Sequence, residues 1–139
     1  MAGNIRLEVV TPQQEVVNEE AQIIVAPGEL GQFGVLVGHT PFMTSLKIGT
    51  IRYTDAQGTE HCVFVSGGFA EALPDKVTVL AESAERRCDI DVERARQAQA
   101  RAEKRLESKT EDLDYTRAKA ALDRAMHRVM LAGTRGSHG

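Results

Sequence analysis

The 139-residue chain changes character once, near residue 87, and this change constrains the fold more than any single motif. From Asp91 to Leu131 the sequence contains neither proline nor glycine and is rich in alanine, which gives this segment the strongest helix preference in the chain. Between Ile5 and Leu80 apolar residues never recur at helical spacing, and glycine and proline interrupt the chain at short intervals. The sequence therefore predicts a β domain over residues 1–86 and a helical domain over residues 87–139.

The N-terminal part reads as about eight or nine short strands separated by turns. Ile5, Leu7 and Val9 alternate with polar or charged residues, which is typical of a half-buried strand. Turn sequences at 47–49 and 66–68 separate several of the later strands. Because tight turns cannot span the crossovers that a parallel sheet needs, we expect an antiparallel β-sandwich or barrel.

The C-terminal part breaks at residues 108–112 and predicts an antiparallel two-helix hairpin. We expect Asp89 or Asp91 to cap the first helix, Thr110 or Asp112 to cap the second, and Gly133 to end it. The inward faces should be Ala95, Ala98, Ala102 and Leu106 on the first helix, and Leu113, Ala118, Ala121, Leu122, Ala125 and Val129 on the second. Alanine removes little apolar surface from water, so this hairpin is either a detachable switch or a small helical domain that simply docks.

Charge and motif content exclude several classes of function. The net charge of −3 divides into −5 over residues 1–87 and +2 over residues 88–139, and neither part is basic enough to suggest nucleic-acid binding. No apolar run approaches the roughly 18 residues of a membrane helix, so we expect no direct membrane insertion. Four histidines and two cysteines lack metal-ligand spacing, and no catalytic triad or paired carboxylates stand out. These absences argue against an enzyme that acts alone.

Four arginines in the helical part form a candidate anion site. Arg94 and Arg101 are seven residues apart, and Arg124 and Arg128 are four apart, so each pair shares a helix face. In a hairpin the two pairs would converge and repel, and guanidinium groups are well suited to bind polyphosphate between them. The other interpretation is a set of solvated faces on which these arginines pair with Asp91, Glu103, Glu107 and Asp123.

Several runs of sequence, in the same order along nearly the whole chain, resemble the epsilon subunit family of F-type ATP synthases. They are GQFGVL at 31–36, GHTP at 38–41, IGTIR at 48–52, VSGGF at 65–69, VTVL at 77–80, DIDVERA at 89–95 and DY at 114–115. Val37 departs from the proline that the family usually has before Gly-His, which should alter the stiffness of the turn.

The resemblance implies a non-catalytic rotor subunit on the cytoplasmic face of the bacterial inner membrane, where it is peripheral. The sandwich would bind the gamma subunit and the c-subunit ring, and the extended helices would reach the alpha/beta catalytic head and restrain ATP hydrolysis. We expect Glu29, Gly31, Gln32, Phe33 and His39 to make the partner contacts of the sandwich. The alternative is a free-standing, nucleotide-responsive adaptor protein with the same fold.

In a subset of bacterial relatives the compact hairpin binds ATP through a motif of Ile or Leu, Asp, two variable residues, Arg and Ala. Ile90, Asp91, Arg94 and Ala95 match that motif, and the supporting positions correspond to Glu85, Arg101, Arg124 and Arg128. The resemblance therefore implies that no cofactor is required and that ATP is a regulatory ligand.

Overall fold

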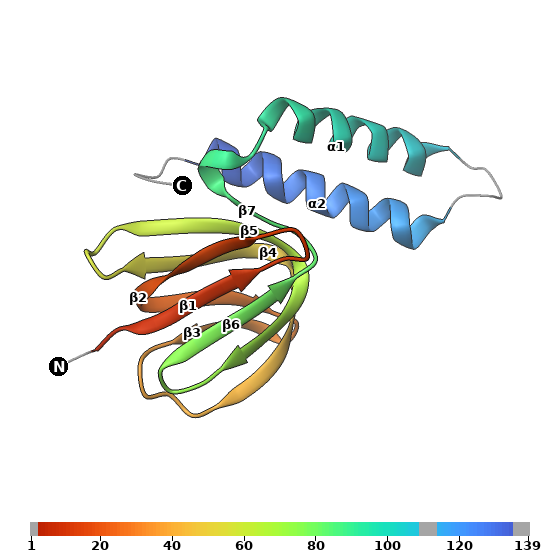
Figure 1. Cartoon of the computed structure of the whole chain (residues 1–139). Helices are drawn as coiled ribbons and strands as arrows, with labels where there is room; N and C mark the ends of the chain where they lie inside the picture. The colour runs from red at the N-terminus through yellow and green to blue at the C-terminus, as the bar shows by residue number, and fades with distance from the viewer. Residues whose placement is uncertain (1–2, 109–113, 135–139) are drawn as a thin grey trace.

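The structure, a computed structural model, describes residues 3–108 and 114–134 as a β-sandwich followed by two helices (Figure 1), which confirms the predicted fold class. The strands are β1 (Ile5–Val10), β2 (Glu15–Gly28), β3 (Gly31–Val35), β4 (Phe42–Asp55), β5 (Glu60–Ala72), β6 (Lys76–Ala81) and β7 (Ala84–Arg86). A 3-10 turn, η1 (Arg87–Asp89), leads into α1 (Val92–Glu107) and α2 (Tyr115–Gly133).

Two of the predicted turns are wrong, because residues 47–49 lie inside β4 and residues 66–68 lie inside β5. The two strands pair in one constant register from Phe42 opposite Ala72 to Thr54 opposite Glu60. Gly68 shows why a glycine can be required inside a strand and not only in a turn. Its φ of +136° is unfavourable for other residues, and a Cβ atom there would lie 2.2 Å from the Leu80 carbonyl oxygen. The glycine therefore lets β5 bend closely against β6 without leaving the sheet.

The expected antiparallel pairing holds for every described strand pair except β1 with β6, which is parallel. β1 lies between β2 and β6, and Val9 is opposite both Val17 and Val79. Tight turns dictate only the pairing of strands that are neighbours in sequence. β1 and β6 are separated by most of the sandwich, so no tight turn fixes their relative direction. Alternate residues of these strands, including Ile5, Leu7 and Val9, are fully buried in one continuous core.

The helices begin and end at residues with clear capping roles. The Asp91 side chain accepts a hydrogen bond from the Arg94 backbone nitrogen at 3.0 Å, as one of the two expected N-caps of α1. Asp114 caps α2 in the same way, whereas Thr110 or Asp112 was the expected cap. Thr110, Asp112 and the expected inward residue Leu113 lie outside the described residues. α2 ends at Gly133, as expected.

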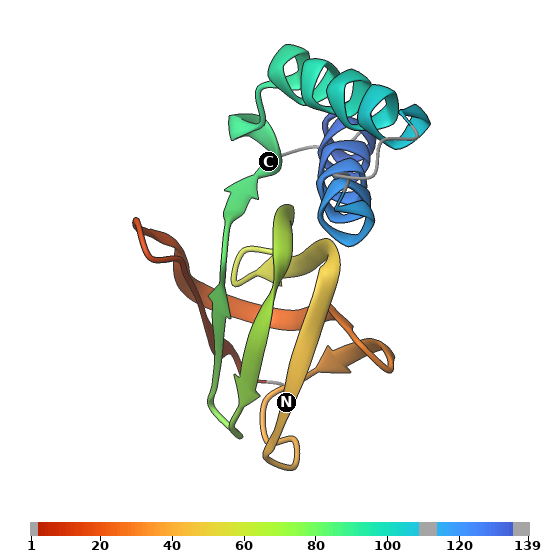
Figure 2. The same cartoon turned by 90° about the vertical axis from the view of Figure 1, so that its right-hand side faces the viewer.

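The hairpin packs through small side chains, as the sequence indicates. Of the predicted inward residues that the structure describes, Ala95, Ala102, Ala118 and Ala125 are buried, and the partly buried ones are Ala98, Leu106, Ala121, Leu122 and Val129. α2 contacts β4, β5 and η1 and lies between the sandwich and α1 (Figures 1 and 2). The attachment of the hairpin to the sandwich therefore depends mainly on α2.

Candidate functional site

A small apolar cluster joins α2 to the outer face of the sandwich. Val63 and Val65 point into the main core, and Phe64 between them points outward, as alternation along β5 requires. Phe64 is completely buried against Ile90 and Leu131, with Ile48 and Ala132 at the edge. This second cluster is much smaller than the core of the sandwich, so the two parts of the chain are held together by few apolar side chains.

Arg128 adds the polar part of this attachment. Its Nε donates to the Glu85 carboxylate on β7 at 2.5 Å, and its Nη2 lies 3.4 Å from the Ser83 hydroxyl oxygen. The guanidinium carbon lies 4.4 Å from the centre of the Phe64 ring, a cation–π contact. Two predicted ATP-site residues, Glu85 and Arg128, are thus brought together as an ion pair that links α2 to β7.

The other six candidate ATP residues have different environments. Ile90 and Ala95 are buried packing residues, and Asp91 caps α1. Arg94 and Arg101 are exposed on α1, whereas Arg124 is half-buried on α2. None of these three arginines forms a salt bridge within the described ranges 3–108 and 114–134.

The carboxylates of the competing, solvated-face interpretation are partly engaged elsewhere. Asp123 pairs with Lys119 at 2.9 Å, and Glu103 accepts a hydrogen bond from Gln99 at 2.9 Å. Neither carboxylate forms the expected arginine pair. Among the described residues, three of the four candidate guanidinium groups are therefore without an ion pair while α1 and α2 are packed together.

The predicted partner residues lie at and near the β2–β3 turn. Gly28 is paired with Gly31 across this turn, and Glu29 and Leu30 form its exposed tip. Phe33 meets Phe42 edge to face at 5.2 Å between ring centres, and His39 approaches Phe42 at 5.6 Å. Gln32 points to the opposite side of β3 and lines a cavity beneath α2. The structure thus brings Phe33 and His39 together and separates Gln32 from them.

Sequence reasoning missed the polar cluster that anchors the connection between the two parts. Arg86 on β7 donates to the Tyr53 hydroxyl at 2.9 Å and the Val16 carbonyl at 3.3 Å, and it pairs with Glu19. Burial is the main reason that the pKa of Tyr53 is raised, so its hydroxyl stays protonated and donates to Glu19. The partners are 33 to 70 residues away from Arg86 along the chain, so no local sequence pattern predicts these contacts.

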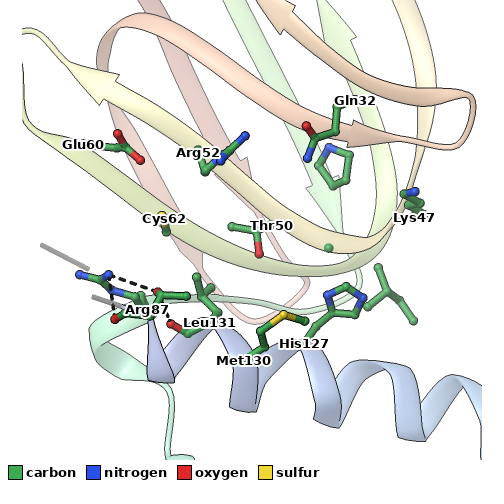
Figure 3. A pocket seen from close by; sticks show the side chains of 14 residues that line it. Gln32, Lys47, Thr50, Arg52, Glu60, Cys62, Arg87, His127, Met130 and Leu131 are labelled. Carbon is green, nitrogen blue, oxygen red and sulfur yellow. Dashed lines mark hydrogen bonds between the residues drawn. The ribbon is translucent and has the colours of Figure 1, made fainter. Parts of the chain in front are cut away.

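Sequence reasoning also missed a cavity of about 610 Å³ between α2 and the β4–β5 face, alongside the Phe64 cluster. Figure 3 shows His127, Met130 and Leu131 extending from α2 toward the strands that carry Thr50, Arg52 and Cys62. The helix residues recur at the spacing of one face, and the strand residues alternate along one side of the sheet. These two periodicities are visible in the sequence, but their meeting depends on how α2 docks.

The comparison with family models decides the identity. Residues 4–87 match the model described as "ATP synthase, Delta/Epsilon chain, beta-sandwich domain", and residues 89–133 match "ATP synthase, Delta/Epsilon chain, long alpha-helix domain". The chain belongs to the ATP synthase delta/epsilon chain family. It is a non-catalytic subunit of the central stalk of F-type ATP synthase.

Named relatives resemble this family member over nearly all its length. The ATP synthase epsilon chain of Desulforapulum autotrophicum is 63% identical over 97% of this chain and 100% of its own. That of Syntrophobacter fumaroxidans is 51% identical over 95% of this chain and 98% of its own. A chain of the Euglena gracilis mitochondrial ATP synthase has the same fold, with a TM-score of 0.77 at 23% identity over 88% of this chain and 78% of that one.

The described residues 3–108 and 114–134 also bear on membrane crossing and on metal binding. No described helix combines the length and the apolar character that crossing a membrane requires. Within the same ranges, no group of three or more His, Cys, Asp or Glu side chains is placed to hold a metal ion.

Proposed function

We propose that the two parts of this stalk subunit have separate tasks. The sandwich attaches the chain to the gamma subunit and the c ring, and the helical hairpin restrains ATP hydrolysis by detaching and extending toward the alpha/beta head. The observation that carries this proposal is the small attachment of α2, which consists of the Phe64 cluster and the Arg128–Glu85 pair. The sandwich has its own continuous core and does not need this attachment to fold. The enzyme and this subunit would lie at the cytoplasmic face of the bacterial inner membrane.

A truncation separates the two tasks. The shortened chain should end after Asp89, because β7 pairs with β5 and carries the anchoring Arg86 and must be kept. We expect membranes with the shortened subunit to retain coupled ATP synthesis and to hydrolyse ATP faster than membranes with the full chain. Unchanged hydrolysis would show that the helices do not inhibit, and loss of assembly would show that they are an anchor.

ATP bound to the compact hairpin is the proposed regulatory signal. Arg94, Arg101 and Arg124 are the three candidate arginines that form no salt bridge in the described part of the chain, and with no anion between them they would repel each other. A polyphosphate between them would favour the packed form over the extended one, to the extent that its affinities for the two forms differ. Because the Asp91 carboxylate caps α1 by accepting a hydrogen bond from the Arg94 backbone nitrogen, its expected part is to orient that helix end.

Isothermal calorimetry on the full chain tests this proposal. We expect ATP binding to be weakened by Arg124→Ala and Arg94→Ala and unchanged by Arg117→Ala, which removes an exposed arginine from the first turn of α2. Absence of binding by the wild-type chain at millimolar ATP would refute a regulatory nucleotide site.

The end of the sandwich around the β2–β3 turn is the proposed c-ring contact. Leu30 is fully exposed at the turn, and Phe42, which meets Phe33 of β3 edge to face, is an exposed apolar residue of β4. Exposed apolar side chains of this kind are typical of a protein interface. In the assembled enzyme, Glu29→Cys should form a crosslink to a cysteine placed in the c-subunit loop. Failure of this crosslink, in a sample where a gamma-facing cysteine reacts, would place the turn elsewhere.

A further inference from the structure

The cavity between α2 and the β4–β5 face has the composition of a ligand site. Its volume of about 610 Å³ is within the range of roughly 300 to 1,000 Å³ that small-molecule sites occupy. Ile48, Met130 and Leu131 supply apolar surface on both the sandwich and the helix side. Gly49 lies so close to Pro27 that a Cβ atom would come within 2.9 Å of the proline ring, so the wall at this point is tightly packed.

The charged residues of the lining are predominantly basic. The side chains of Lys47 and Arg52 are exposed and form no salt bridge within residues 3–108 and 114–134. Arg87 lines the same cavity and is held near α2 by contacts to Thr134 at 3.4 to 3.5 Å. Glu60 is the single acidic residue of the lining. The fixed charges of the cavity therefore sum to +2, apart from His127.

The nearest thiol does not neutralise this charge. Cys62 is paired with Arg52 across β4 and β5, and burial raises the pKa of its thiol above the usual value. It therefore remains protonated at neutral pH and offers the cavity no anion. A monoester phosphate carries a charge of about −1.5 to −2 at pH 7, which complements the lining.

We propose that this cavity binds a small organic phosphate, with the phosphate at Lys47 and Arg52 and an apolar body against Ile48 and Met130. The site is separate from the arginines of the hairpin, because its basic side chains come from β4 and η1 and the lining includes none of Arg94, Arg101, Arg124 and Arg128. A bound ligand would contact the sandwich and α2 at once. It would therefore stabilise the docked hairpin, and this proposal does not depend on ATP binding elsewhere.

The test uses 1-naphthyl phosphate as the probe and the uniformly ¹⁵N-labelled full chain. We expect saturable amide shifts around Lys47, Thr50 and Met130, and neither inorganic phosphate nor 1-naphthol should reproduce the affinity. Lys47→Gln and Arg52→Gln should each weaken binding by about fivefold or more, as expected for loss of a hydrogen bond to a charged group. Lys104→Gln and Arg105→Gln are matched controls on the exposed side of α1 and should bind like the wild type.

Three results would overturn the proposal. The first is absence of saturable shifts at millimolar probe, and the second is equal affinity for 1-naphthol, which would mean that the anion is not recognised. The third is competition by ATP together with loss of binding in Arg94→Ala, which would assign the probe to the hairpin arginines. Failure of ATP to bind the chain would leave naphthyl phosphate binding intact, so the two proposals fail separately. Both glutamine variants replace exposed side chains, and their amide spectra will verify that the fold is retained.

Discussion

Replacement of Arg128 by alanine should loosen α2 from the sandwich more than any other single charge change in the helix. The variant loses the hydrogen bond to Glu85, the contact with Ser83 and the cation–π contact with Phe64. A hydrogen bond to a charged group contributes about 1.5 to 3 kcal/mol when buried, and a cation–π contact about 0.5 to 1 kcal/mol near the surface. The side chains of Arg128 and Glu85 are 24% and 32% exposed, so solvent screening lowers the first figure.

We therefore expect a total loss of about 2 kcal/mol, which reduces the docking equilibrium constant by a factor of about 30. Hydrogen exchange of the α2 amides in the full chain measures this constant when exchange requires undocking. Arg117→Ala is the control, because it makes the same substitution at an exposed position of the same helix. An α2 that exchanges at the wild-type rate in Arg128→Ala would refute the idea that this arginine holds the helix in place. A double-mutant cycle with Glu85→Ala then isolates the contribution of the pair.

Three further predictions concern the sandwich. Gly68→Ala should cost about 2 kcal/mol or more in urea unfolding, because its Cβ meets a carbonyl oxygen, whereas Gly58→Ala, with positive φ and open space around it, should cost only about 1 kcal/mol. Arg86→Leu should cost about 2 kcal/mol in the same assay, because it removes the hydrogen bonds to the Tyr53 hydroxyl and the Val16 carbonyl and leaves the Glu19 carboxylate without its cation, and a neutral result would contradict its anchoring role. The hydrogen bond from His61 lowers the pKa of Asp55. The stabilisation that ionised Asp55 gives the folded state is therefore complete above its ordinary pKa of 3.8, and it is lost as the pH falls through the lower pKa that Asp55 has in the folded state. The unfolding midpoint of Asp55→Asn should therefore fall less steeply than that of wild type in this acidic range, and parallel curves would argue against the prediction.

The sequence predicts the division into strands and helices because the two parts use different local rules. Alanine content and the lack of glycine and proline mark the helices, and Asp91 marks the start of the first one. The same rules fail at Gly67 and Gly68, because glycine permits both a turn and a bent strand. Only the neighbouring β6 decides between these outcomes, and local sequence does not contain that information.

The candidate sites likewise contain some features that local sequence predicts and others that depend on how distant segments pack. The arginine spacing on each helix follows from helical geometry, so Arg94, Arg101 and Arg124 are recognisable before the structure is known. The partners of Arg128 are more than 40 residues away, and the attachment at Glu85 therefore emerges only from the docking of α2. The cavity is hidden for the same reason, since Lys47 and Arg52 look like ordinary solvated residues of a strand.

The docking equilibrium of α2 connects the Arg128 pair with the proposed phosphate site. A ligand that binds only the docked form has an apparent dissociation constant equal to the intrinsic constant divided by the docked fraction. If the wild-type hairpin is docked far more than 30 to 1, a loss of about 2 kcal/mol in Arg128→Ala leaves that fraction near one, and the affinity for 1-naphthyl phosphate stays constant. If docking is weaker, the affinity falls in proportion to the docked fraction measured by hydrogen exchange. We expect titration and exchange on Arg128→Ala and Arg117→Ala to follow this relation. An affinity that rises when Arg128 is removed would show that the probe prefers an undocked form, and the cavity would then not be its site.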